Sequence, residues 1–144
     1  MARATRQRRQ VVLLFLDLNG FKAINDSLGH VEADRLLQQV GGRLTSCIRR
    51  SDTACRFGGD EFVVLLTGIE RRNQAMAVIN TVIVELAAPY QIDGIPVSMT
   101  ASLGVATFPA DGQNYHELLQ AADATMYRDK ASCCTVSALG PEAV

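Results

Sequence analysis

Two acidic positions in the chain could meet and hold a metal ion. Asp17 ends an apolar run, and Asp60 stands in the sequence Gly58-Gly59-Asp60-Glu61, where the missing glycine side chains leave room for a ligand to approach the backbone. If the two segments are neighbouring strands, the carboxylates converge and repel unless a cation lies between them. Mg²⁺ suits such a place, because it binds one or two carboxylates together with substrate phosphates. The alternative interpretation is that Asp17 is a simple strand-end residue and that residues 58–61 form an ordinary solvated turn.

A second set of polar residues follows Asp17. Residues 19–22 lead from a strand into a helix, where unpaired N–H groups favour phosphate and Lys22 adds a cation. The segment is not a Walker loop, which needs G-x-x-x-x-G-K followed by Ser or Thr. Asn25, His30 and Asp34 lie on the next helices, and Asn and Asp side chains carry donors and acceptors that can read guanine. The alternative is that they are polar residues on helix surfaces.

Three charged residues stand at helix ends. Arg49 and Asp52 follow a long helix, and Lys130 ends the last one. An R-x-x-D arrangement is common by chance and is typical of a helix cap with a local ion pair, and a cation is favourable at any helix C-terminus. Taken alone, these residues indicate no ligand site.

Strands and helices that alternate along the chain must position these residues. The apolar run 11–16 indicates a buried central strand, and apolar residues at three- and four-residue spacing indicate amphipathic helices. Gly58-Gly59 and Asp93-Gly94 predict hairpins, because tight hairpin turns need the positive φ that glycine adopts easily. The expected strands are 11–16, 53–57, 62–66, 90–92 and 96–107, and the expected helices are 21–28, 32–48, 74–88 and 116–131.

The resulting order, β-α-α-β-β-α-β-β-α, predicts an α+β fold. Two hairpins and one solitary strand make a mostly antiparallel central sheet, which the helices must flank. The architecture is ferredoxin-like or polymerase-palm-like. The strand order does not follow from the pattern.

Length and composition predict one compact domain. A chain of 144 residues with 48% hydrophobic residues is large enough for a single core and too apolar for a disordered tail. The longest apolar run, 11–16, is far shorter than the roughly 20 residues that a membrane helix needs. Nothing at the N-terminus is typical of a secretory signal. We expect a cytoplasmic domain, whose parent protein can still be membrane-anchored.

Charge is distributed unevenly along the chain. Four arginines give the first nine residues a charge of +4, so the rest carries about -5 of the total of -1. A basic arm can bind nucleic acid or an anionic membrane, but an acidic body binds a phosphate backbone poorly. We therefore interpret residues 1–10 as a solvated stump and expect no nucleic acid partner.

The four cysteines predict no metal site. Cys47 and Cys55 have apolar neighbours and are interpreted as small core residues in a reducing compartment. Cys133 and Cys134 are adjacent. None of the four forms a C-x-x-C pair or stands at metal-ligand spacing from a histidine.

Four ordered segments resemble the GGDEF domain of the diguanylate cyclase family over about residues 11–131. They are LDLNGFKAINDSLGH at 16–30, FGGDEF at 57–62, SLGVA at 102–106 and ADATMYRDK at 122–130. Their spacing is most similar to that of domains found in tandem with an EAL phosphodiesterase domain.

The resemblance implies that two GTP molecules condense to cyclic di-GMP, releasing two pyrophosphates, where two such domains face each other. It also implies a divalent cofactor, Mg²⁺ or Mn²⁺, held by Asp17, the Leu18 carbonyl and Asp60. Asp60 or Glu61 would assist deprotonation of the attacking hydroxyl. Lys22 would neutralise phosphate charge at the catalytic centre.

The resemblance further implies a nucleotide pocket and a separate site for the product. In the implied nucleotide pocket, Asn25 and Asp34 would read guanine and His30 would line the pocket. Lys130 would neutralise phosphate charge. The nucleotide would lie against Gly58 and Gly59. Arg49 and Asp52 stand at the family's inhibitory position, where cyclic di-GMP binds and gives feedback inhibition. A guanidinium suits bidentate contact with phosphate or guanine.

The chain departs from the family pattern at several positions. Asn19 stands where a second acid is usual, Ala33 replaces a frequent Gly, and Cys-Cys-Thr at 133–135 replaces the usual Gly-Arg-Asn, so an arginine for the terminal phosphates is missing. The family's opening segment is also absent, and we expect a domain at 11–131 and a tail at 132–144. The missing arginine and the missing opening segment favour the alternative hypothesis of a weak or inactive module that binds GTP or cyclic di-GMP and regulates a neighbouring EAL-type domain. The intact Asp60 and Glu61 favour the enzyme.

Overall fold

The computed structural model describes residues 10–132, and the side chains of residues 10–126. Its elements are β1 (Gln10–Asn19), α2 (Phe21–Leu28), α3 (His30–Cys47), β2 (Thr53–Gly58), β3 (Glu61–Ile69), α4 (Arg72–Ala87), β4 (Tyr90–Ile92), β5 (Ile95–Val97), β6 (Thr100–Phe108) and α5 (Tyr115–Ser132). None of the helices in this part of the chain has both the length and the hydrophobicity that a membrane crossing requires.

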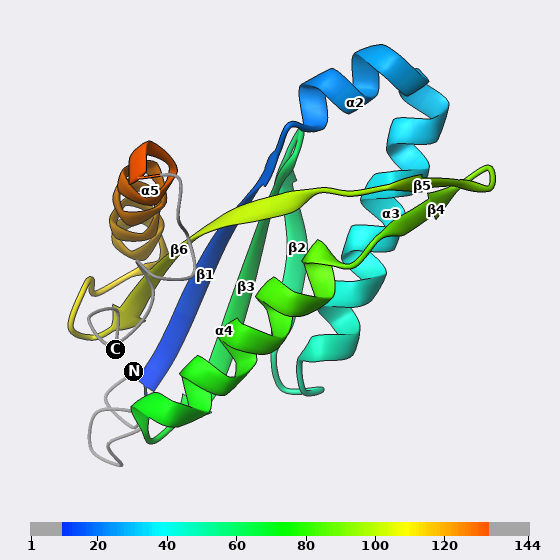
Figure 1. The fold of residues 1–144 in the computed structure, drawn as a ribbon. Helices are drawn as coiled ribbons and strands as arrows, with labels where there is room; N and C mark the ends of the chain where they lie inside the picture. The colour runs from blue at the N-terminus through cyan, green and yellow to red at the C-terminus, as the bar shows by residue number, and fades with distance from the viewer. Residues whose placement is uncertain (1–9, 133–144) are drawn as a thin grey trace.

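An antiparallel sheet in the order β2-β3-β1-β6 lies at the centre of the fold. Figure 1 shows α3 and α4 on one face of this sheet and α5 on the other. This arrangement confirms the predicted α+β fold with a mostly antiparallel sheet flanked by helices.

The central strand β1 is buried on both faces. Leu14 and Leu16 lie in the larger core with residues of α3 and α4, whereas Leu13 and Phe15 lie in a smaller core with residues of α5. Because alternate side chains of a strand point to opposite faces, a strand with helices on both sides must be apolar throughout. The interpretation of the run 11–16 as a buried central strand is therefore confirmed.

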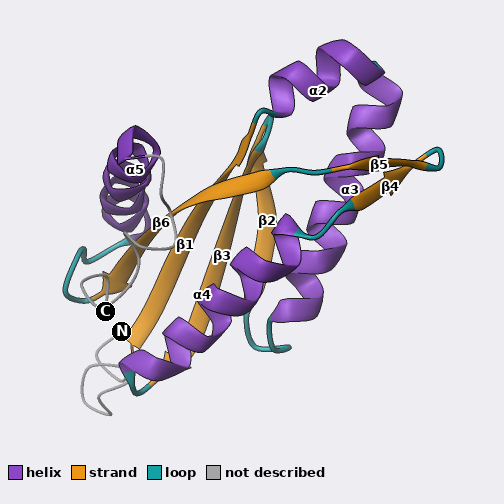
Figure 2. Cartoon of the chain, in the orientation of Figure 1, coloured by secondary structure: helices purple, strands orange, loops and turns teal. Residues whose placement is uncertain are grey.

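The predicted strand 96–107 is wrong, because this segment forms two strands. β5 ends at Val97 and pairs with β4 in a separate ribbon, whereas β6 begins at Thr100 and joins the central sheet. Between them, Met99 buries its side chain in the larger core, and this inward turn interrupts the strand. Figure 2 shows the β4–β5 ribbon projecting beside α3.

Long polar side chains of α3 hold the ribbon and α4 in place. Arg35 pairs with Asp93 at the ribbon turn, with a nitrogen–oxygen distance of 2.9 Å. The Arg43 guanidinium lies 3.7 Å from the centre of the Tyr90 ring. It also donates hydrogen bonds to the last carbonyls of α4 and the residues after it, those of Glu85, Ala88 and Pro89.

Positive φ explains one of the two predicted hairpin turns. Asp93 and Gly94 have φ of 52° and 77°, as a tight two-residue turn requires. Gly58 and Gly59 are not among the described glycines with positive φ, so the conformational reason given for that turn is wrong. A Cβ added at Gly59 would meet no atom within 4 Å, and glycine there leaves open space instead.

Of the two central cysteines, only Cys47 packs as predicted. Cys47 is half-buried against the larger core, and burial, with a smaller effect from Glu85, raises the pKa of its thiol. Cys55 is exposed, so its interpretation as a core residue is wrong. Cys55 pairs with Val63 on the face of the sheet that α5 covers. It is exposed because α5 packs on β6 and β1, whereas Cys55 belongs to the edge strand β2.

Candidate active site

Asp17 lies near the end of the central strand, between two polar neighbours. Its Cα partners are Glu61 on β3 and Ser102 on β6. Directly paired residues point to the same face, and Leu13 and Phe15, two alternate positions earlier, point to the face that α5 covers. The strand end therefore places three polar side chains together on that face.

The turn between β2 and β3 lies against the same strand end. The Leu18 N–H donates a hydrogen bond of 3.1 Å to the Asp60 carbonyl. Asp17 and Asp60 are half-buried, and Leu18 is buried. β1 and β3 are therefore neighbouring strands, which is the condition for Asp17 and Asp60 to converge. The two acidic positions lie side by side.

The oxygen atoms at this strand end suit a hard divalent cation. The carboxylates of Asp17 and Asp60 and the carbonyl of Leu18 are the donor type that Mg²⁺ and Mn²⁺ bind. Among the described side chains, no three His, Cys, Asp or Glu residues cluster as a metal site. Two carboxylates and one carbonyl leave coordination positions for phosphate oxygens, which is how Mg²⁺ is usually held at nucleotide sites.

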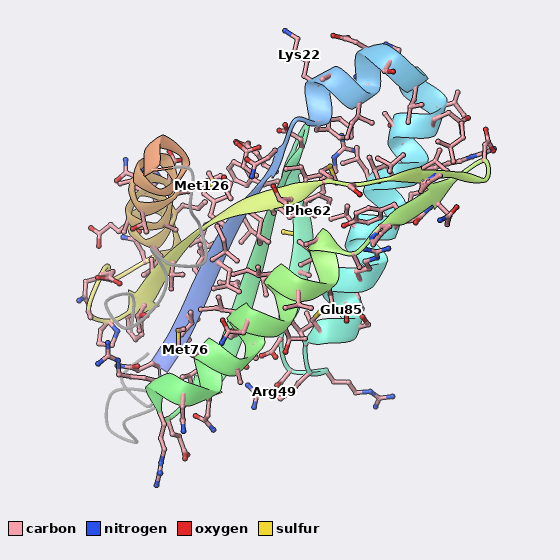
Figure 3. All side chains as sticks on the ribbon, in the orientation of Figure 1. Lys22, Arg49, Phe62, Met76, Glu85 and Met126 are labelled. Carbon is pink, nitrogen blue, oxygen red and sulfur yellow. The ribbon has the colours of Figure 1, made fainter. Side chains whose placement is uncertain are left out.

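Helices α2 and α3 bring the predicted nucleotide residues to the same end of the sheet. Lys22 is in the first turn of α2 and points into solvent (Figure 3). The Oδ1 atom of Asn25 is buried without a hydrogen-bond partner, the one such atom among the described side chains. An unpaired buried acceptor costs about 1–3 kcal/mol, so a ligand N–H would be favourable there. His30 and Asp34 are exposed on α3.

A pocket of about 480 Å³ lies between α3 and the β2–β3 hairpin. Its volume is in the range of about 300–1,000 Å³ that small-molecule sites occupy. Asp34 lines it, whereas Lys22, Asn25 and His30 do not. The lining residues are Asp34, Leu37, Gln38, Gly41, Leu44, Thr45, Ala54, Cys55, Arg56 and Phe62.

Arg56 is a site residue to which the sequence analysis assigned no role. It lines the pocket, and its Nε donates to the carbonyls of Gly58 and Gly59, at 3.3 and 3.1 Å. The guanidinium therefore braces the turn that carries Asp60. In the sequence, only the position of Arg56 before the glycine pair could have indicated this role. Its hydrogen-bond partners are backbone carbonyls, so no pattern of side-chain types points to them.

Arg49 and Asp52 lie at the opposite end of the β2–β3 hairpin from the Gly-Gly turn. Asp52 accepts hydrogen bonds from the N–H groups of Thr67 and Arg49 and from the Arg49 guanidinium, which also donates to the Thr67 carbonyl. Burial acts to raise the pKa of the Asp52 carboxyl, but these hydrogen bonds outweigh it and hold the pKa below its usual value. The Asp52 side chain is 1% exposed and that of Arg49 56%.

Several predicted positions lie outside the described residues. α5 includes Lys130, but its side chain is not among those described. Residues 1–9 of the predicted stump, the Cys133-Cys134 pair and residues 133–144 of the predicted tail also lie outside.

Known proteins match this chain along most of its length. The profile of the family described as "Diguanylate cyclase, GGDEF domain" matches residues 1–133. The chain is 43% identical to the bifunctional diguanylate cyclase/cyclic di-GMP phosphodiesterase MucR of Pseudomonas aeruginosa, over 88% of this chain and 18% of MucR. It is 40% identical to the cyclic di-GMP phosphodiesterase NbdA of the same organism, over 84% of this chain and 15% of NbdA. The chain thus spans less than a fifth of either relative.

Solved structures share the fold. The GGDEF domain of TpbB (YfiN) from Pseudomonas aeruginosa superposes with a TM-score of 0.86 at 36% identity, covering 91% of this chain and 82% of that one. An EAL/GGDEF domain protein from M. capsulatus gives a TM-score of 0.81 at 41% identity, covering 85% and 79%. Sequence and structure agree that the chain belongs to the diguanylate cyclase GGDEF domain family.

Proposed function

We propose that this domain makes cyclic di-GMP from two GTP molecules and releases two pyrophosphates. The pairing of Asp17 with Glu61 supports the proposal most, because it puts an oxygen-rich strand end beside the Gly-Gly-Asp-Glu turn. Phe62, the next residue of β3, points to the opposite face of the sheet, where it lines the pocket. Phosphoryl transfer needs positioning and charge stabilisation more than covalent chemistry, and a strand end rich in oxygen ligands for a cation suits the need for charge stabilisation.

At the reacting end, Asp17, the Leu18 carbonyl and Asp60 would hold Mg²⁺ or Mn²⁺. When bound, the cation stabilises charge on the attacking and leaving oxygens. Asp60 or Glu61 would accept the proton of the 3′-hydroxyl, whose oxygen attacks the α-phosphate of the second GTP. Lys22, in the first turn of α2, would balance phosphate charge at the helix start.

The base would be read by Asn25 and Asp34. The partnerless Asn25 Oδ1 is an acceptor that an N–H of the base would satisfy. The Asp34 carboxylate, at the pocket, would accept from guanine N1–H and the 2-amino group. His30 would line the nucleotide site and Lys130 would add a cation for the phosphates, with the glycine turn leaving room for the nucleotide.

Catalysis would need two GTP-loaded domains, because each 3′-hydroxyl attacks the α-phosphate held by the other domain. Two copies facing each other across a two-fold axis meet this requirement. The proposed partners are therefore a second GGDEF domain and, in a longer chain such as that of MucR, a phosphodiesterase domain of the EAL type.

A second candidate function is a binding module that regulates a neighbouring domain. NbdA is described as a cyclic di-GMP phosphodiesterase, although this chain is 40% identical to its matching segment. A domain this similar therefore occurs in a protein named for breaking the dinucleotide down.

Incubation of the protein with GTP and Mg²⁺ is expected to yield cyclic di-GMP, and a chelator of divalent cations is expected to stop its formation. Because two domains must meet, the rate per domain should rise with protein concentration. Chromatography of the nucleotides measures both effects. GTP binding without product, from a protein shown to be dimeric, would contradict the cyclase proposal and favour the regulatory module.

We also propose that Arg49 and Asp52 form an inhibitory site for cyclic di-GMP. The buried Asp52 carboxylate already has hydrogen bonds to both of its oxygens, so its role would be to orient the guanidinium. The exposed Arg49 would then contact the ligand. The span of β2 separates this site from the Gly-Gly turn by roughly 17 Å at the usual rise of a strand.

Arg49→Ala is expected to weaken cyclic di-GMP binding about 10- to 100-fold, the range that corresponds to a hydrogen bond with a charged group. Titration calorimetry of the folded variant measures the loss. Arg50→Ala is the matched control, because it removes the same charge from the exposed neighbouring residue. Equal affinities of the two variants would refute the role of Arg49.

A further inference from the structure

The SLGVA segment on β6 contains a buried hydroxyl that the proposed reaction does not use. Ser102 is 2% exposed, and it and Asp52 are the buried polar residues of the described chain. Its Oγ donates a hydrogen bond of 2.9 Å to Asn19 Oδ1. Asn19 Nδ2 in turn donates to Thr100 Oγ1 at 3.0 Å. The three side chains form one hydrogen-bonded network across β1 and β6.

This network lies at the end of β1 that carries the proposed cation ligands Asp17 and Leu18. Asp17 pairs with Ser102 and Asn19 pairs with Thr100, so the network brackets Leu18 on both sides. Gly104, two residues after Ser102 and on the same face of β6, lies against the backbone of α5.

The network adds a side-chain tie to the backbone pairing of β1 with β3 and β6 and to the hydrogen bond from Leu18 to Asp60. β1 ends at Asn19, and Gly20 follows with a φ of 78° and no side chain to pack. Glycine at a strand end gives the backbone wide freedom, so the directions of the Asp17 carboxylate and the Leu18 carbonyl depend on neighbouring contacts. Both polar atoms of the Asn19 amide are used within the network.

We infer that Ser102 and Asn19 are positioning residues, which hold the Asp17–Leu18 end of β1 in the orientation that binds the divalent cation. Residue 19, where the family usually has an acid, acts here as a tie to β6 and not as a ligand. The inference rests on the proposed function, because it assigns a metal to this strand end. Hydrogen-bonded groups behind metal ligands typically change metal affinity 10- to 100-fold when removed.

Mn²⁺ titration of the whole chain, followed by electron paramagnetic resonance, tests the inference without relying on turnover. Ser102→Ala and Asn19→Leu are expected to raise the Mn²⁺ dissociation constant about tenfold or more. Asn19→Asp keeps an oxygen for the Ser102 hydroxyl and adds a charge, so it should bind Mn²⁺ at least as tightly as the parent. Ser98→Ala, an exposed serine just before β6, is the matched control and should change nothing.

Asp17→Asn defines which part of the Mn²⁺ signal belongs to this site, and circular dichroism confirms that each variant is folded. Unchanged affinity in Asn19→Leu would overturn the inference, and this variant decides the question if Ser102→Ala does not fold. Mn²⁺ binding with the expected variant pattern but no cyclic di-GMP would uphold the inference and refute the cyclase. If Asp17→Asn removes none of the Mn²⁺ binding, both the inference and the cyclase proposal are overturned.

Discussion

Replacing Asp60 by asparagine is expected to reduce cyclic di-GMP synthesis more than about 100-fold, beyond the range for residues that only support a metal ligand. The amide keeps the size of the side chain but removes the charge that would bind the cation. The Asp60 carbonyl, which accepts the Leu18 N–H at 3.1 Å, is unchanged. The turn should therefore stay beside β1, and initial rates at saturating GTP measure the loss.

Glu85→Gln provides the control for this prediction. It removes one negative charge from an exposed position on α4, and Figure 3 places Glu85 far from the end of the sheet at which Lys22 lies. Both variants should unfold at denaturant concentrations close to that of the parent. Parent-like synthesis by a folded Asp60→Asn protein would remove Asp60 from the proposed metal site.

Local patterns were sufficient to predict most elements of the fold. The apolar run 11–16 predicts a central strand because burial on both faces leaves no room for polar alternation. Gly29 ends α2, as expected, with a φ of 93° that other residues rarely adopt. The division of 96–107 was missed because it depends on the burial of Met99 in a core built by distant elements. A pattern within one segment carries no information about that contact.

The candidate site shows the same division between local and distant information. Asp17 and the glycine turn are visible as residue types, but their proximity depends on β1 pairing with β3, which the sequence pattern left open. The brace from Arg56 to two backbone carbonyls and the burial of Ser102 depend on the folded chain. Sequence reasoning therefore proposed the groups that could react and missed those that hold them in place.

Gly104→Ala is expected to destabilise the domain by about 3 kcal/mol or more, at or above the upper range for overpacking a core. A Cβ on Gly104 would lie 1.9 Å from the Ala122 carbonyl oxygen and 2.9 Å from the Met126 backbone nitrogen. These are backbone atoms of α5, so the whole helix would have to move. That movement would separate Ala122 and Met126 from the smaller core, and denaturant unfolding measures the cost.

Gly42→Ala is the matched control, because it adds the same methyl group to a helix interior where a Cβ would meet no atom within 4 Å. It should stabilise the domain by about 0.5–1 kcal/mol, since alanine loses less backbone entropy than glycine on forming a helix. Opposite signs for the two substitutions would show that close packing of α5 on β6 requires glycine at position 104. A Gly104→Ala domain as stable as the parent would mean that α5 can shift without loss, which is incompatible with its packing on β1 and β6.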